Sequence, residues 1–298
     1  MTPTNAAETW PQAQTDLQAR WGLQALQQQL QALEPRIEVE VLESVGSTNS
    51  TLLEQAAAAS RQARASGANP SFHARLLVAE SQTEGRGRQG RRWHASPGAS
   101  LTFSLALTLA PQDWSGLSLA VGVALAQALE PAARASMALK WPNDLWLRDA
   151  SAPGGGRKLG GVLIETTGWA SGTERVCVIG VGLNVRAQTV QEASSGVACL
   201  QEIWPEASAP AALARVAPAL LQAARRFERE GFAGVQAAFA ERDLLKGHAV
   251  TTTQAGLPAG HAEGVDATGA LRVRAPDGTL HHLVGGEVSV RTLFGKTS

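Results

Sequence analysis

Residues 85–93 read Gly-Arg-Gly-Arg-Gln-Gly-Arg-Arg-Trp, which places three glycines and four arginines in nine residues. Glycine lets a backbone N–H approach a ligand without obstruction by a side chain. Arginine offers a planar, permanently charged fork of donors that matches carboxylates and phosphates. Because so much positive charge on one loop is costly without an anion, this segment predicts a loop that closes over a negatively charged small molecule. A solvated basic turn is the alternative interpretation, and the rest of the chain decides between the two.

The composition describes an ordinary globular chain that is not basic as a whole. The 298 residues include 26 basic and 26 acidic side chains, so the formal net charge is zero. Proteins that bind nucleic acid usually carry an excess of basic residues. Because this chain has none, we expect no DNA partner. No apolar run approaches the roughly 20 residues that span a bilayer, and the first residues lack the pattern of a signal peptide. We therefore expect a cytoplasmic protein that does not enter a membrane.

Hydrophobic spacing orders the elements along the chain. It predicts, in sequence, a helix over 14–33, a strand over 37–41, a helix over 49–66, strands over 75–80 and 101–109, a buried helix over 117–129, short strands at 138–140 and 145–147, a hairpin of 160–167 with 176–181, and a helical region over 210–242. Leu213, Leu220, Phe227 and Phe239 are the candidate core positions of that last region. Cys177 lies in an apolar run, which favours a buried structural thiol. After Lys246, short alternating runs separated by turns predict a small all-β barrel, with a hairpin at Pro276-Asp277-Gly278.

Four further segments complete the pattern. They are 46–49 (Gly-Ser-Thr-Asn), 80–82 (Glu-Ser-Gln) leading into the arginine loop, 140–145 (Lys-Trp-Pro-Asn-Asp-Leu) and 158–165 (Lys-Leu-Gly-Gly-Val-Leu-Ile-Glu), and they are followed by 180–185 (Gly-Val-Gly-Leu-Asn-Val). Taken in this order and spacing, the segments closely resemble those of the biotin protein ligases. The resemblance covers roughly residues 37–292.

The resemblance implies an α+β fold with a central mixed sheet flanked by helices, of the class II synthetase-like type, and a small C-terminal SH3-like β-barrel. The expected organisation is an N-terminal tail and helix at 1–36, a catalytic domain that binds biotin and ATP at 37–246, and the barrel at 247–298. The implied reaction joins biotin and MgATP into biotinyl-5′-adenylate and pyrophosphate. A lysine of a biotin carboxyl carrier protein or domain, as in acetyl-CoA carboxylase, then attacks the mixed anhydride. ATP, biotin and Mg²⁺ are the expected cofactors and substrates.

The resemblance also assigns site residues. The expected catalytic residues are Lys158, Arg88, Arg86 and Asp144, and Asp144 is also the candidate Mg²⁺ ligand. The expected biotin-binding residues are Ser47, Thr48, Asn49, Gln82, Gly85, Arg86, Gly87, Arg88, Lys158, Gly160 and Gly161. The expected ATP- and adenylate-binding residues are Arg88, Arg91, Trp93, Asn143, Asp144, Asn184 and Arg291. The cations would let an anionic carboxylate approach an anionic α-phosphate.

Several assignments have a structural alternative. Ser47 and Thr48 either bind the ureido ring of biotin or only cap a helix, and both can hold together. Lys158 could be a surface lysine, but at the start of an apolar strand it is better explained by an anionic partner. Asp144 could serve the metal or the incoming amine. Trp93 is a lid over the adenylate or an anchor for its loop.

Other candidate site residues also have a structural alternative. Gln82 could face solvent at a strand end, and residues 140–144 could be a plain turn. Glu287 and Arg291 match the C-terminal signature of the family, and an interdomain ion pair explains them as well as ATP binding does.

Some biotin ligases carry an N-terminal winged helix-turn-helix. Only 46 residues precede Ser47, so we expect a monofunctional enzyme without that module. Two other functions compete: a lipoate or octanoyl ligase of the same fold, and a non-enzymatic biotin sensor. A homodimer is possible, because sheet edges could pair across two copies.

Overall fold

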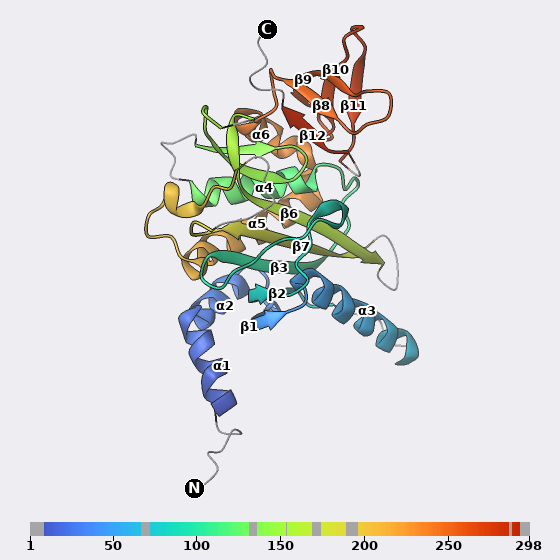
Figure 1. Ribbon diagram of the computed structural model, residues 1–298. Coiled ribbons are helices and arrows are strands. Elements are labelled where there is room, and N and C mark those ends of the chain that lie inside the picture. The colour runs from blue at the N-terminus through green and yellow to red at the C-terminus, as the bar shows by residue number, and fades with distance from the viewer. Residues whose placement is uncertain are drawn as a thin grey trace.

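The fold is that of a computed structural model, which describes residues 9–66, 72–130, 136–152, 154–168, 174–188, 196–285 and 288–292. A seven-stranded sheet forms the centre of the molecule, and a five-stranded sheet follows it at the C-terminal end (Figure 1). Within the described ranges, every helix is too short or too polar to cross a membrane.

The large sheet is mixed, as the family resemblance implied. Its strands lie in the order β1-β2-β3-β7-β6-β5-β4, where β1 and β2 pair in parallel and all the other pairs are antiparallel. The strands are β1 Glu38–Val45, β2 Arg75–Gln82, β3 Ser100–Leu109, β4 Met137–Lys140, β5 Asp144–Arg148, β6 Gly156–Gly168 and β7 Arg175–Asn184. The predicted hairpin is confirmed as β6 and β7, which pair over nine positions.

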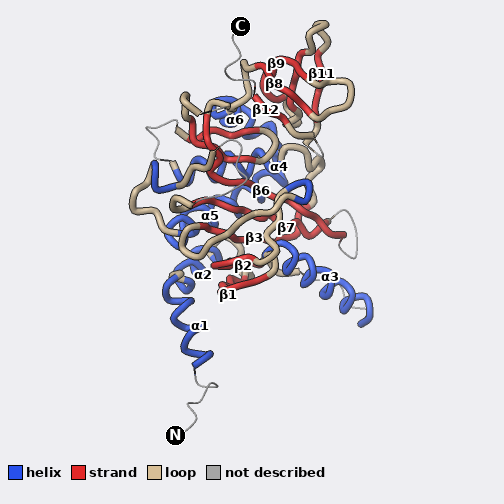
Figure 2. The backbone as a smooth tube through the Cα atoms, viewed as in Figure 1, coloured by secondary structure: helices blue, strands red, loops and turns tan. Residues whose placement is uncertain are grey.

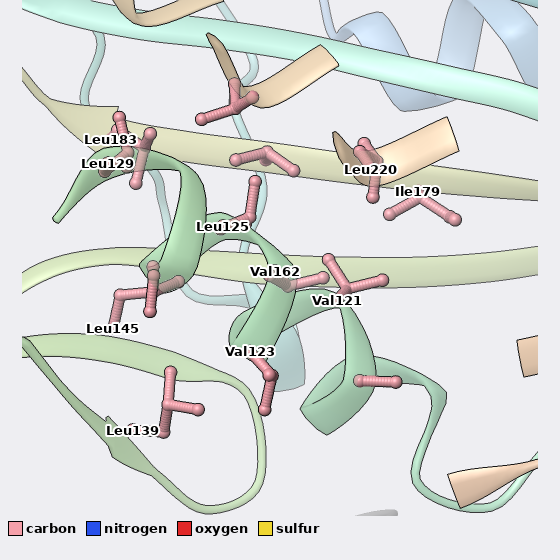
Figure 3. Packing of buried hydrophobic residues seen from close by; sticks show 14 of the residues in the cluster. Val121, Val123, Leu125, Leu129, Leu139, Leu145, Val162, Ile179, Leu183 and Leu220 are labelled. Atoms are coloured by element: carbon pink, nitrogen blue, oxygen red, sulfur yellow. The ribbon is translucent and has the colours of Figure 1, made fainter. Parts of the chain in front are cut away.

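Helices cover both faces of this sheet, so its central strands are apolar on both sides. Along β2, Leu76 and Val78 join the larger core cluster, whereas the intervening Leu77 packs with Leu52 and Ala56 of α3 (Thr48–Ser66). Successive residues of a strand point to opposite faces, so α3 covers one face. The helices α4 (Leu117–Leu129) and α5 (Ala209–Glu230) pack on the other. Figure 3 shows side chains of α4, among them Val121 and Leu125, in one cluster with Val162 and Ile179 of the strands.

Two predicted helices are interrupted. The expected helix over 14–33 consists of α1 (Thr9–Arg20) and α2 (Leu23–Gln31), because Gly22 adopts a left-handed conformation at φ 57° that ends one helix and starts the next. The region over 210–242 is divided by Gly231 into α5, a 3₁₀ turn (η4, Phe232–Val235) and α6 (Gln236–Arg242). Its four predicted core residues are all buried, as is Cys177, and burial raises the pKa of the Cys177 thiol to about 12.

The glutamines of the first two helices have a structural use. β1 is an edge strand, and Gln27 of α2 donates to Ile37 O at 2.6 Å and accepts from Val39 N at 2.9 Å. Gln14 of α1 donates to Val41 O at 3.0 Å. These amides bond to the edge as a neighbouring strand would, which satisfies backbone groups that an edge otherwise leaves open. The helix pair therefore covers this edge of the sheet.

The C-terminal region forms an antiparallel sheet of order β11-β10-β9-β8-β12. Its strands are β8 Ala249–Thr252, β9 Ala259–Val265, β10 Leu271–Arg274, β11 Leu280–Leu283 and β12 Val290–Thr292. The hairpin predicted at residues 276–278 is confirmed between β10 and β11. Trp141 ties this sheet to the first one, since its indole N–H donates to Gly269 O at 3.1 Å. The second sheet thereby comes to lie beside the turn between β4 and β5.

Candidate active site

A cavity of about 470 Å³ lies between the α3-covered face of the large sheet, the arginine loop and the end of the C-terminal sheet. Its wall comes from the start of α3, the end of β2, the β4–β5 turn, β6, β7 and residues 289–292. Most of the sequence-predicted site residues meet here: Ser47, Thr48, Asn49, Gln82, Arg86, Gly87, Arg88, Arg91, Trp93, Asn143, Asp144, Lys158, Gly161 and Arg291. Segments more than two hundred residues apart in sequence thus share one cavity.

The arginine loop is folded back on itself. Gly87 N donates to Arg91 O at 2.7 Å and Trp93 N donates to Gly85 O at 2.9 Å, with a single 3₁₀ turn, η2 (Arg88–Gly90), between the two arms. Figure 2 shows this loop and its short helix passing in front of β7 and β6. The tip contacts the C-terminal sheet region, where the Ser289 hydroxyl bonds to Gln89 Oε1 at 3.1 Å. The loop therefore roofs the cavity and touches both sheets.

Trp93 packs against the floor of the cavity. A Cβ on Gly182 of β7 would overlap the indole ring of Trp93, so this strand position accepts only glycine while the ring lies there. The Trp93 indole nitrogen is buried and has no hydrogen-bond partner among the described residues. The ring therefore anchors the loop on β7, and its N–H points to a contact that a ligand could complete.

One end of the cavity is neutral and hydrogen-bonded. Ser47, Thr48 and Asn49 are all buried at the start of α3. Ser50 N donates to the Ser47 hydroxyl at 3.4 Å, which is the predicted cap. Thr48 N donates to Gln82 Oε1 at 2.8 Å. Gln82 therefore lines the cavity instead of facing solvent, and the amide and hydroxyl groups at this end suit a neutral polar ligand group.

The opposite end carries the charged groups. Lys158 Nζ lies 2.7 Å from Asp144 Oδ1. Asn143 donates to Val162 O at 2.6 Å and accepts from Arg88 Nη1 at 3.2 Å. Burial lowers the pKa of the Arg88 guanidinium, with Asp144 opposing the shift and Arg91 adding to it. These contacts bring the loop, the β4–β5 turn and β6 together around one point.

Lys140 is a site residue that the sequence reasoning quoted but did not assign. It lines the cavity, and its Nζ lies 4.2 Å from the centre of the Trp146 ring. Burial lowers the pKa of Lys140 to about 8, with Asp144 raising it and Lys158, Arg291 and Arg91 lowering it further. Its position immediately before the Trp-Pro-Asn-Asp turn is the sequence feature that could have identified Lys140 as a site residue.

Three predicted site residues do not line the cavity. A Cβ on Gly85 would overlap Trp93 O, and one on Gly160 would overlap Gly182 O, so both positions keep backbone segments close together. Asn184 is buried and donates to Ala198 O at 3.1 Å while its own oxygen accepts from Gln188 at 2.8 Å. The structure gives these residues a packing role next to the site. Glu287 lies outside the described residues.

The charge balance of the cavity differs from that of the whole chain. Among the described residues, its wall carries seven cationic side chains and one carboxylate, that of Asp144; the cations are Arg86, Arg88, Arg91, Arg92, Lys140, Lys158 and Arg291. The chain as a whole is neutral. Such a concentration of positive charge in a cleft focuses the field on an anionic ligand. Within the described residues, no three His, Cys, Asp or Glu side chains are placed to hold a metal ion together.

The comparisons with known proteins agree with this geometry. Residues 70–184 match the biotin/lipoate A/B protein ligase family, and residues 251–291 match the biotin protein ligase C-terminal domain. The biotin–[acetyl-CoA-carboxylase] ligase of Paracoccus denitrificans is 32% identical over 217 residues, which cover 68% of this chain and 85% of that protein. The chain belongs to the biotin protein ligase family.

Other members of the biotin protein ligase family extend beyond the matched region. The bifunctional ligase/repressor BirA of Escherichia coli is 34% identical over 220 residues, which cover 72% of this chain but only 66% of BirA. Among solved structures, the biotin protein ligase of Aquifex aeolicus in complex with biotin and ATP superposes with a TM-score of 0.67 at 26% identity, covering 86% of this chain and 99% of that one. This likeness confirms the mixed sheet flanked by helices and the C-terminal antiparallel sheet.

Proposed function

We propose that this chain attaches biotin to a lysine of a biotin carboxyl carrier protein or domain, using MgATP and biotinyl-5′-adenylate as the intermediate. The observation that carries the proposal is the cavity with two unlike ends: a neutral, hydrogen-bonded end, and an end where Arg88, Lys140 and Lys158 surround Asp144. Biotin has a matching division, with a neutral ureido ring at one end and a carboxylate at the other. The family and the A. aeolicus complex support the same assignment.

In the first step, an oxygen of the biotin carboxylate attacks the α-phosphorus of ATP, and pyrophosphate leaves. Both reactants are anionic, so the barrier includes their repulsion. Arg88 is held in place by Asn143, and Lys158 by Asp144. Cations fixed in advance stabilise the charge that develops without reorganising during the reaction. Holding both substrates in one cavity also removes the entropic cost of their encounter.

In the second step, the amine of the acceptor lysine attacks the carbonyl carbon of the mixed anhydride, and AMP leaves with the bonding electrons. The attacking nitrogen releases its proton to solvent as the amide bond forms, and Asp144 is the only carboxylate in the described cavity wall that could orient the amine. Asp144 is engaged with Lys158 at 2.7 Å. That engagement favours a shared role, in which Asp144 holds Lys158 for the first step and orients the amine in the second.

The donor set also fits Mg²⁺, which proteins commonly hold through one or two carboxylates together with substrate phosphates. Asp144 would provide the carboxylate and Asn143 an amide oxygen. When bound, the ion neutralises charge on the triphosphate.

Mass spectrometry of an acceptor domain incubated with the protein, biotin and MgATP tests the proposal. We expect one biotinyl group on one lysine, and no modification when ATP is omitted. A parallel incubation with lipoate separates the two ligases of this fold. Transfer of lipoate in preference to biotin would contradict the proposed substrate. Modification without ATP would contradict the proposal that an adenylate is the intermediate.

A further inference from the structure

The start of β6, which carries Lys158, has a different neighbour from the rest of that strand. β7 pairs with β6 from Gly160 onward. At Lys158, the short segment 196–198 takes the place of β7. Lys158 N donates to Gly196 O at 3.2 Å, and Ala198 N donates to Lys158 O at 2.9 Å. Both backbone groups of Lys158 are therefore held by a segment that lies outside the named strands.

The preceding residue, Arg157, fastens this segment to the sheet. Its Nη1 donates to Val197 O at 3.2 Å. The guanidinium also pairs with Glu202 through two nitrogens, Nη1 to Oε1 at 3.1 Å and Nη2 to Oε2 at 2.5 Å. Its Nε donates to Asp149 Oδ2 at 3.0 Å. One side chain thus joins the β5–β6 loop to residues 196–202.

The surroundings of Arg157 fit an arginine in shape as well as in charge. Glu202 Oε1 also accepts from Cys199 N at 2.9 Å, so the carboxylate is held by its own 3₁₀ turn, η3 (Leu200–Glu202). The stem of Arg157 lies against Gly196, where a Cβ would come within 3.0 Å of Arg157 Cγ. A lysine has no planar fork with which to bond several acceptors at once.

Arg157 and Lys158 share a backbone but not their surroundings, because successive residues of a strand point to opposite faces. Lys158 lines the cavity and lies 2.7 Å from Asp144. Arg157 is not among the described residues of the cavity wall. An effect of Arg157 on the reaction therefore has to pass through its neighbour.

The cluster is partly exposed to solvent, which limits its strength. The side chains of Arg157, Glu202 and Asp149 are 30%, 34% and 26% exposed. Water weakens such pairs, but a forked pair within a network of charges contributes more than an isolated surface pair does. The hydrogen bonds between Arg157 and Glu202 raise the pKa of the guanidinium and lower the pKa of the carboxyl group. Both groups therefore stay charged at neutral pH.

We propose that Arg157 is a positioning residue for Lys158: by clamping residues 196–202 to the start of β6, it fixes the backbone from which the Lys158 ammonium reaches Asp144 and the reacting groups. The inference rests on the proposed function, because that function assigns Lys158 to the first step. A cation stabilises developing charge only if it is held at the right place, so a clamp on its backbone contributes to the rate.

Arg157→Lys tests the clamp, because it keeps the positive charge and removes the fork. The rate of biotin-dependent exchange between pyrophosphate and ATP should fall about 10- to 10²-fold, the loss expected when a reacting group is displaced by about 1 Å. Biotin affinity by calorimetry should stay constant, because the neutral end of the cavity is unchanged. An undiminished exchange rate would overturn the proposal.

Arg225→Lys is the matched control for a general loss of stability. The Arg225 side chain is 32% exposed and bonds to the carboxylates of Glu34 and Glu228 and to a backbone carbonyl. It belongs to α5, on the face of the sheet opposite the cavity. Both variants should lower the melting temperature to a similar extent, but only Arg157→Lys should slow the exchange. An equal loss of exchange in the two variants would show that Arg157 acts on stability alone.

A double-mutant cycle tests whether Arg157 acts through Lys158. In the Lys158→Ala background no ammonium remains to be positioned, so Arg157→Lys should cause no further loss of exchange. A loss of the same size in both backgrounds would contradict the positioning role. Absence of biotin-dependent exchange in the wild type would overturn the proposed function and the role of Arg157 with it. Normal exchange in both the wild type and Arg157→Lys would overturn only the role of Arg157.

Discussion

The two ends of the cavity differ in the side chains that they offer a ligand, although the same arginine loop lies above both. At the neutral end, Gln82 Oε1 accepts from Thr48 N, and the buried side chains of Thr48 and Asn49 both contact the Ser104 hydroxyl. At the charged end, Arg88, Lys140 and Lys158 surround Asp144, the single carboxylate among the described residues of the cavity wall. The first end is thus preorganised and selects by hydrogen bonding. The second gains most from the ligand, because each added negative charge relieves repulsion among the cations.

The largest expected effect is at the charged end. Lys158→Ala should reduce the rate of biotin-dependent exchange between pyrophosphate and ATP by about 10²- to 10³-fold, the usual loss when one preorganised group that stabilises developing charge is removed. Biotin binding at the neutral end should change little.

Lys246→Ala is the control for the loss of a lysine, because Lys246 is exposed and does not line the cavity. A Lys158→Ala enzyme with undiminished exchange would show that the charged end is not where the first step occurs.

A smaller effect is expected at the neutral end. Thr48→Val keeps the shape of the side chain but removes the hydroxyl that bonds to Gln82 and Ser104. Biotin affinity by calorimetry should fall about tenfold, because a buried partner is left unsatisfied, while the KM for ATP stays constant. Thr51→Val, one turn along α3 and outside the cavity wall, is the control. A matching change in the KM for ATP would show that the two ends do not act separately.

Much of the fold could be predicted because its signals are local. Alternation of apolar residues predicted β3, and Asp277-Gly278 predicted the turn between β10 and β11. The β6–β7 hairpin was also predicted, from the neighbouring segments 160–167 and 176–181. The helix breaks at Gly22 and Gly231 were missed, because a glycine within an apolar helical pattern is usually tolerated, and only the tertiary packing decides whether it turns left-handed.

In the site, too, local sequence predicted some features, and others depend on tertiary packing. The motifs predicted which segments converge, since residues from 47–49, 82–93, 140–144 and 158–161 do line one cavity. They could not predict the partners of each side chain. The spacing treats Arg86 and Arg88 as equivalent, but the structure pairs one with Glu165 and the other with Asn143. The sequence pattern did not indicate that Ser104 belongs to the site, because a serine within an apolar strand looks like any other small residue.

The smallest expected effect concerns Lys140. Raising the pH should weaken the use of ATP at the charged end and leave biotin binding at the neutral end unchanged. Burial lowers the pKa of this ammonium to about 8, more than two units below an ordinary lysine. Its charge is therefore present at pH 7 and is lost as the pH rises through 8. If Lys140 helps to hold the phosphates, kcat/KM for ATP should fall about fourfold between pH 7 and 8.5, since this parameter reports the ionisation of the free enzyme. kcat should change less, because bound phosphate stabilises the protonated form. Biotin affinity should be flat over the same range. Lys140→Arg, which stays charged, should remove the decline in kcat/KM, and a decline that persists in this variant would assign it to another group.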